Sequence, residues 1–95
     1  MKTATLMRPW AIADGISLEK ADAELLAYIV IVTRSQQFPP TVREMKAAFS
    51  LGTAPIMNRL KRLQAVGCID WVPRRSRSIY LLTPVKIAIG IPCET

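Results

Sequence analysis

The segment QQFPPTVRE, residues 36–44, constrains the fold more than any other part of the sequence. Pro39 and Pro40 cannot continue a helix, and they hold the chain extended. Thr41 and Glu44 then have the T-x-x-E spacing of a capping box, in which each side chain accepts a hydrogen bond from a backbone amide at a helix start. The segment therefore predicts that one helix ends before Pro39 and that another begins at residue 42.

The residues before this segment predict a first helix over roughly 18–34. Ser17 is placed to cap it, and Glu19 falls in its first turn, where the helix dipole favours an acid. Apolar side chains recur at helical spacing along one face: Leu18, Ala21, Leu25, Ile29 and Val32. Further apolar side chains form its back: Ala23, Ala27, Val30 and Ile31. A helix that is apolar on nearly all sides should be covered on both.

Two shorter helices are predicted after the capping box. The second covers about 42–49, and the turn SLG follows it, where Gly52 is able to take a positive φ. The third starts near Thr53 and ends at Gly67 as a C′ glycine. It tolerates Pro55 because amides in the first turn of a helix have no helical partner. Its buried stripe consists of Ile56, Leu60 and Leu63.

Two runs rich in β-branched and aromatic residues, CIDWV and SIYLL, flank an arginine-rich turn at 73–78 and predict a hairpin. The tail PVKIAIGIP also has the composition of a strand. Helix, short helix, tight turn, longer helix and hairpin is the order of a winged helix-turn-helix. The predicted fold class is therefore mainly α with a small β-hairpin: three helices, a two-stranded wing and an extra strand from the termini. The predicted division is an N-terminal extension at 1–16, the winged domain at 17–82 and a C-terminal extension at 83–95.

Positive charge is concentrated in one part of the chain. The net charge is +6, and residues 41–82 alone hold eight basic side chains against two acidic ones. A basic block inside one folded segment indicates a surface for a polyanion.

The composition argues against several other classes of protein. The chain has no histidine, two cysteines without CxxC spacing, no clustered carboxylates and no glycine-rich phosphate loop. An enzyme, a metal site and a bound cofactor are therefore not expected. No apolar run in the sequence is long enough to cross a bilayer, and no signal peptide is visible. These features predict a cytoplasmic protein without membrane contact.

Residues 38–82, FPPTVREMKAAFSLGTAPIMNRLKRLQAVGCIDWVPRRSRSIYLL, resemble the DNA-binding domain of LexA-type repressors. That family shows a PPT/S-x-x-E-I opening to its second helix, an L-x-x-L-x-x-x-G-x-I passage into the wing and an I-x-L-L wing end. The resemblance extends over roughly 17–82. The matching positions are Pro39, Pro40, Thr41, Glu44 and Met45, then Leu60, Leu63, Gly67 and Ile69, then Ile79, Leu81 and Leu82.

The resemblance implies a sequence-specific double-stranded DNA-binding transcriptional regulator, a repressor of the phage, prophage or plasmid type. The stretch LGTAPIM starts the third helix one residue shorter than in the family, and Ala54, Pro55 and Met57 stand where the family has polar readers. The family's operator is therefore not carried over. Because the sequence stops at residue 95, the self-cleaving peptidase domain of that family is expected to be absent.

The candidate DNA-binding residues come from the second helix, the third helix and the wing. On the third helix the outward face offers an amide and two cations for base edges or phosphate. The wing arginines are placed for the backbone or a narrow minor groove, and amides near Thr41 and Thr53 for phosphate. The full set is Thr41, Arg43, Lys46, Thr53, Ala54, Met57, Asn58, Lys61, Arg62, Arg74, Arg75 and Arg77.

Two questions stay open at this stage. The apolar back of the first helix is covered either by residues 2–8 or 84–91 of the same chain or by a second copy in a homodimer, and the homodimer is favoured. The apolar start of the third helix, Ala54 to Met57, also fits a second function, a winged-helix adaptor that binds a host regulator or RNA polymerase.

Overall fold

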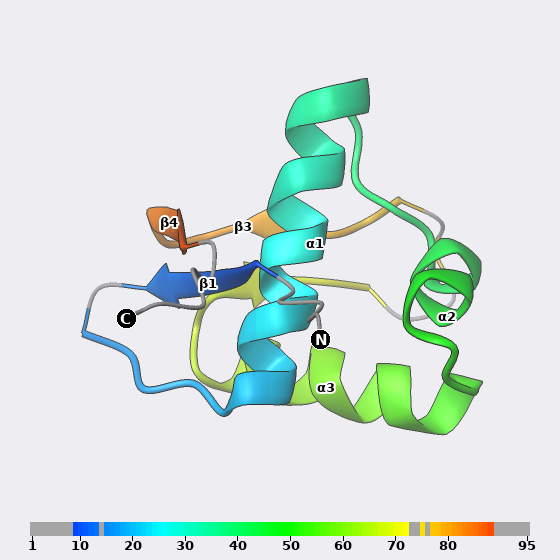
Figure 1. Ribbon diagram of the computed structural model, residues 1–95, viewed down its shortest axis with the longest axis horizontal. Helices are drawn as coiled ribbons and strands as arrows, with labels where there is room; N and C mark the ends of the chain where they lie inside the picture. The colour runs from blue at the N-terminus through cyan, green and yellow to red at the C-terminus, as the bar shows by residue number, and fades with distance from the viewer. Residues whose placement is uncertain (1–8, 14, 73–74, 76, 89–95) are drawn as a thin grey trace, which may run out of the picture.

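The computed structural model describes residues 9–13, 15–72, 75 and 77–88. Its helices and strands follow one another along the chain as shown in Figure 1. In order they are β1 (Trp10–Ala13), α1 (Lys20–Gln36), α2 (Val42–Phe49), α3 (Thr53–Ala65), β2 (Ile69–Asp70), β3 (Tyr80–Leu81) and β4 (Val85–Ala88). Among these residues the predicted fold class is confirmed, because helices α1 to α3 are followed by the antiparallel pair β2–β3.

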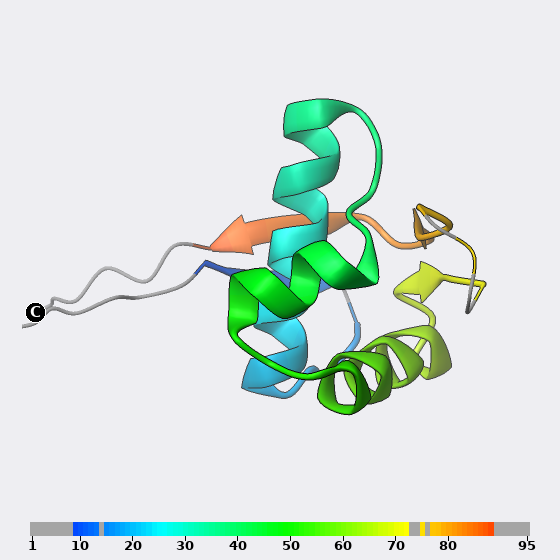
Figure 2. The same ribbon diagram turned by 90° about the vertical axis from the view of Figure 1, so that its right-hand side faces the viewer.

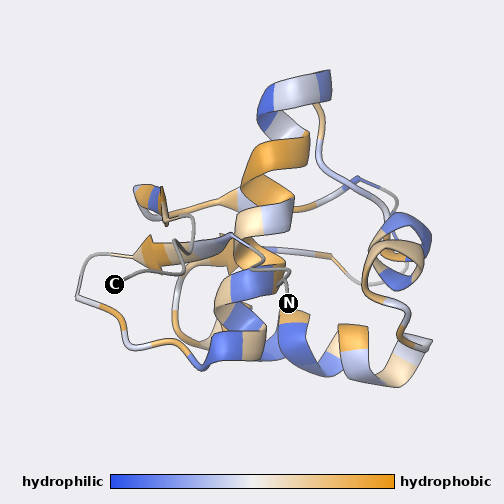
Figure 3. Ribbon diagram, viewed as in Figure 1, coloured by the Kyte–Doolittle hydropathy of each residue, from blue (hydrophilic) through white to orange (hydrophobic). Residues whose placement is uncertain are grey.

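Helix α1 is central, and the other elements are arranged around it (Figures 1 and 2). Its middle turns are apolar and its two ends hydrophilic (Figure 3). The predicted stripe of α3 is fully buried, as are Met45 of α2 and Cys68 before β2. The buried core brings together side chains of all three helices and the hairpin, among them Leu25, Leu26, Ile29, Met45, Ile56, Leu60, Leu63, Ile69 and Trp71.

The start of α1 differs from the prediction. The helix begins at Lys20, its N-cap is Glu19, and no side chain caps it. Ser17 instead belongs to the connection after β1, where the Ile16 amide donates to the Ala13 carbonyl (3.1 Å). Leu18, in the same connection, packs against the core. The predicted Ser17 cap is therefore wrong, and the helix starts two residues later.

Helix α2 begins and ends where the sequence predicts. The Thr41 hydroxyl accepts from the Glu44 amide (3.1 Å), and the Glu44 carboxylate accepts from the Thr41 amide (2.9 Å), so the capping box is confirmed. The turn after α2 differs, because Ser50 has the positive φ, at 54°, and Gly52 is extended with φ −78°. Gly52 serves instead as the N-cap of α3.

The end of α3 confirms the prediction of a glycine cap. Val66 is the C-cap, and Gly67 follows it with φ 87°. The Gly67 amide donates to the Gln64 carbonyl (3.1 Å) and the Cys68 amide to the Leu63 carbonyl (3.0 Å), the two bonds of a Schellman motif. This motif turns the chain directly from α3 into β2.

The two predicted extensions meet in a second sheet. Strands β1 and β4 pair antiparallel, with Trp10 opposite Ala88 and Ala13 opposite Val85. Strand β1 packs on α1, and its Ala11 and Ala13 are buried there. On the back of α1, Ala27 and Val30 are buried, while Ile31 stays 40% exposed. In Figure 2, β4 leads away from α1 on the side opposite the β2–β3 hairpin.

No helix within the described ranges is long and apolar enough to span a membrane. The same part of the chain contains no group of three metal-ligating side chains.

Candidate nucleic-acid interface

The face of α3 opposite its buried stripe carries a short row of exposed side chains. At 3.6 residues per turn, Ala54, Asn58, Lys61 and Ala65 lie nearest the middle of that face, and all four are exposed. Two polar groups are therefore set between small alanines. Alanine also lets a helix approach another surface closely. The predictions for Ala54, Asn58 and Lys61 as outward residues are confirmed, whereas no observation tests their contact with DNA.

Met57 lies nearer the core than the prediction placed it. Its side chain is half-buried and packs against the core cluster. Arg59 is also half-buried, and an arginine can bury its aliphatic stem along the core while its charged end stays in water. The accessible row of α3 is therefore narrower than the sequence suggested. The first turn of the helix, with Thr53 and Pro55, is exposed and is not strongly hydrophilic (Figure 3).

Arg62, predicted to face outward for DNA, is exposed, but its guanidinium is already bound to another residue of the chain. Its Nε and Nη2 each donate to a carboxylate oxygen of Asp22 on α1, both at 2.9 Å. The Asp22 side chain is only 6% exposed and the Arg62 side chain 48% exposed. Hydrogen bonding to Asp22 raises the pKa of Arg62 above its ordinary value, so the guanidinium is always charged. This two-pronged contact fixes α3 against α1.

The helix starts and α2 contribute the other predicted contacts. The Thr41 hydroxyl is used inside the capping box, whereas no side chain caps α3, which begins at Thr53. Arg43 is exposed on the first turn of α2, and Lys46 is half-exposed one turn later. The N-terminus of α3 thus keeps first-turn amides that no described side chain satisfies, as phosphate binding by a helix requires.

The wing turn is organised by one buried hydroxyl. Ser78 Oγ accepts from the Val72 amide (3.2 Å) and lies within hydrogen-bond distance of the Val72 and Arg75 carbonyls (2.8 and 2.9 Å). The Arg75 amide donates to the Val72 carbonyl (3.2 Å). Gln64 of α3 donates to the Trp71 carbonyl (3.1 Å), which links the third helix to the wing. Trp71 is buried.

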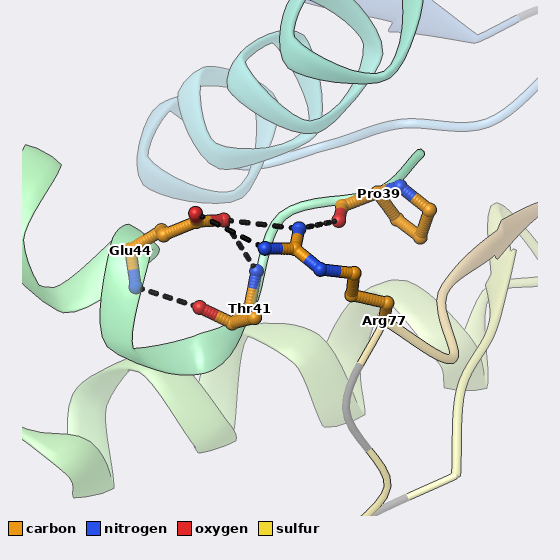
Figure 4. A network of polar contacts seen from close by, with 4 residues as sticks. All are labelled: Pro39, Thr41, Glu44 and Arg77. Atoms are coloured by element: carbon orange, nitrogen blue, oxygen red, sulfur yellow. Dashed lines mark hydrogen bonds and ion pairs between the residues drawn. The ribbon is translucent and has the colours of Figure 1, made fainter. Parts of the chain in front are cut away.

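The three wing arginines are not equivalent. Arg75 is exposed, and its guanidinium makes no hydrogen bond or ion pair with a described residue. Arg74 lies outside the described residues. Arg77 donates through Nη1 to the Pro39 carbonyl (2.8 Å) and through both Nη atoms to Glu44 (3.4 Å each), as Figure 4 shows. Its guanidinium also lies over the Phe38 ring, 4.4 Å from the centroid.

These contacts explain the acidity of Glu44. The Thr41 amide, and after it Arg77, hold the pKa of the Glu44 carboxyl below its usual range. A carboxyl whose pKa is lowered by folding stabilises the folded state above its unfolded pKa, and this contribution is lost as the pH falls through the folded pKa.

Comparing the wild type with Glu44→Gln isolates the stabilisation by the ionised carboxylate, because glutamine keeps an oxygen acceptor for the Thr41 amide. We expect the wild type to melt at a higher temperature than the variant near pH 7. The difference should begin to shrink as the pH drops below about 4, the ordinary range of glutamate, and it should be lost as the pH falls through the lower folded pKa. Melting temperatures of the two proteins from pH 7 to pH 3 measure it. Parallel curves over the whole range would contradict the prediction.

Sequence reasoning missed Asp22 and the partners of Arg77. Asp22 is an acid on a helix that is otherwise apolar on most sides, and this misplaced charge was the available signal of a buried pair. Its partner is 40 positions away, so no local pattern could identify it. The Pro39 carbonyl is invisible to any sequence motif, because a backbone acceptor carries no residue identity.

Comparison with known proteins agrees with this architecture. The chain is 35% identical over 66 residues to a protein of Synechocystis sp. described as transcription regulator LexA; the match covers 68% of this chain and 32% of that protein. It is 28% identical over 75 residues to the LexA repressor of Myxococcus xanthus, covering 78% of this chain and 34% of the repressor. The chain thus spans about a third of the length of these relatives. Residues 16–78 match the family described as the LexA DNA binding domain, and the chain belongs to that family.

Proposed function

We propose that the chain is a sequence-specific double-stranded DNA-binding transcriptional regulator that acts as a repressor. The observation that carries the proposal is the exposed row Ala54, Asn58, Lys61 and Ala65, which lies opposite the buried stripe of the third helix of a winged helix-turn-helix. In such folds this helix enters the major groove. Family membership and the names of the two relatives support the same function.

The chemistry of the row suits base recognition. An asparagine such as Asn58 can form two hydrogen bonds with adenine, and a lysine such as Lys61 can reach guanine or phosphate. Alanine can contact the methyl group of thymine, which gives Ala54 and Ala65 a role without a polar group. The half-buried Met57 contributes at the edge of the row.

The backbone contacts are assigned to residues on either side of α3. Arg75 and the neighbouring Arg74 are proposed for the wing contact, on the backbone or in a narrow minor groove. Arg43, Lys46 and the uncapped start of α3 at Thr53 are proposed for phosphates. Arg62 is bound to Asp22, and because the two charges largely cancel at a distance, this pair adds little to the attraction for phosphate.

The first test is fluorescence anisotropy of a labelled random-sequence duplex with the purified protein at about 50 mM salt. We expect binding, followed by enrichment of a defined site when a random duplex library is selected. Asn58→Ala should relax the preference at one base position of that site. Absence of binding at this salt concentration would reject the proposal.

Two further parts of the proposal are that the regulator is of the phage, prophage or plasmid type and that it forms a homodimer. Ile12 on β1 and Ile31 on α1 are exposed although most of the surrounding apolar surface is covered. Two copies would read a two-fold operator with more affinity than one. Sedimentation analysis of the wild type and of Ile31→Glu should show a dimer that the variant dissociates. A monomeric wild type at micromolar concentration would contradict it.

A protein adaptor is the second candidate, and one observation favours it. Apolar side chains are exposed on and beside the hairpin: Val66, Val72, Tyr80, Leu81 and Leu82. Exposed apolar surface of this kind marks protein interfaces. A pulldown from nuclease-treated lysate separates the two candidates, because only a protein partner remains bound after the nucleic acid is removed.

A further inference from the structure

Arg77 is held by the segment that leads into α2. We propose that Arg77 is a positioning residue, which ties the wing turn to Pro39 and Glu44, and that Arg75 is thereby presented to the DNA backbone. The inference rests on the proposed DNA-binding function. It divides the arginines of the wing into one that sets the position of the turn and one that makes the contact.

The guanidinium of Arg77 is occupied on several sides. Its short bond to the Pro39 carbonyl is 2.8 Å, within the range of a good hydrogen bond, and Glu44 lies beside both Nη atoms at 3.4 Å. One face of the group covers the Phe38 ring. A phosphate would have to displace these contacts, whereas the exposed Arg75 gives up no contact with a described residue.

The backbone at Arg77 supports the same division. Arg77 has φ 55°, in the left-handed region that residues with a side chain rarely adopt. Such a conformation persists where the surrounding structure enforces it. Here the guanidinium is bound 33 residues away in sequence, at Glu44, and the next residue, Ser78, is buried with its hydroxyl beside the Val72 and Arg75 carbonyls. Arg75 therefore lies in a turn that is held from both ends.

Electrostatics gives a third reason. Arg77 and Glu44 form an ion pair in which both side chains are partly exposed, at 37% and 40%. The two charges cancel at a distance, so the pair adds little to the attraction for a polyanion. Exposed pairs also add little to global stability. The pair is thus suited to fixing local geometry.

The central experiment is a double-mutant cycle in duplex binding, with Arg75→Gln, Arg77→Gln and the double variant. We expect each single variant to bind about tenfold more weakly, the effect of one charge-assisted contact. The double variant should bind about as weakly as Arg75→Gln alone. Both changes act on the same contact of Arg75 with DNA, so displacing the turn has no further effect once that contact has been removed. The proposal would be overturned if the double variant bound about a hundredfold more weakly than the wild type, or if Arg75→Gln bound as tightly as the wild type.

Two further variants separate position from charge. Glu44→Gln removes an acid from a basic surface, so electrostatics alone predicts tighter binding, whereas the positioning role predicts weaker binding by several-fold. Arg77→Lys keeps the charge but not the planar fork, and it should bind as weakly as Arg77→Gln. Rescue by lysine, or tighter binding of the Glu44 variant, would assign Arg77 to a direct contact instead.

A measurement without DNA distinguishes failure of this inference from failure of the proposed function. The Arg75 amide, bonded to the Val72 carbonyl, should exchange its hydrogen severalfold faster in Arg77→Gln than in the wild type. The Gly67 amide, bonded to the Gln64 carbonyl at the other end of the hairpin, is the control and should not change. Unchanged exchange at Arg75 would overturn the positioning role. If the wild type binds no DNA, the function fails and this exchange result still stands.

Discussion

Raising the salt concentration from about 50 to about 200 mM is expected to weaken duplex binding by about a thousandfold. Each phosphate that a basic side chain neutralises releases condensed counterions, so log K falls with log salt by about 0.9 per contact. With about six phosphate contacts per protomer, the slope is about −5. Anisotropy titrations at four or five salt concentrations measure it.

Matched charge variants locate the contacts. Arg43→Gln, at the exposed start of α2, should reduce the slope by about one. Lys86→Gln removes the same charge from β4, which pairs with β1, and should leave the slope unchanged. A slope near zero in the wild type would exclude a surface built for phosphates, and equal changes in both variants would show that only net charge matters.

Replacing Arg62 by leucine is expected to lower the free energy of unfolding by about 2 kcal/mol. Breaking a fully buried ion pair costs about 3–5 kcal/mol, because the remaining charge has no partner. The Arg62 side chain is 48% exposed, so water can partly solvate Asp22 after the change, and the smaller value applies. Urea unfolding followed by circular dichroism measures the loss.

The neighbouring Lys61 supplies the control. Lys61→Leu removes an equal charge from an exposed position of the same helix and should change stability by less than about 0.5 kcal/mol. The double variant Asp22→Leu with Arg62→Leu should recover most of the stability, because no buried charge is left alone. Equal losses of unfolding free energy in Lys61→Leu and Arg62→Leu would show that the contact of Arg62 with Asp22 contributes nothing to stability.

Much of the fold was predictable because its signals act within one helical turn. The capping box joins Thr41 to Glu44, three residues apart, and Gly67 ends α3 through bonds to residues three and five positions away from their donors. The stripe of α3 follows from helical spacing alone. Two local predictions were wrong, the Ser17 cap and the positive φ at Gly52.

The site was predictable as a surface but not in its detail. Exposure of Asn58 and Lys61 follows from the period of the helix, whereas the roles of the arginines depend on what lies opposite them. Arg62 turns toward a buried acid of α1, and Arg77 toward a carboxylate and a backbone carbonyl. An arginine that lies beside a carboxylate forms an ion pair within the protein, whereas an exposed arginine without such a neighbour is available to bind a ligand.

Neighbouring residues and composition are enough to predict the order and limits of α2, the end of α3, the buried stripe and the basic character of residues 41–82. Which cations are engaged, and how the back of α1 is covered, depends instead on contacts between distant parts of the chain. The Asp22–Arg62 pair, the Glu44–Arg77 pair and the β1–β4 sheet join residues 33 or more positions apart. Such contacts form only where the core brings distant segments together, and their energy comes from that proximity.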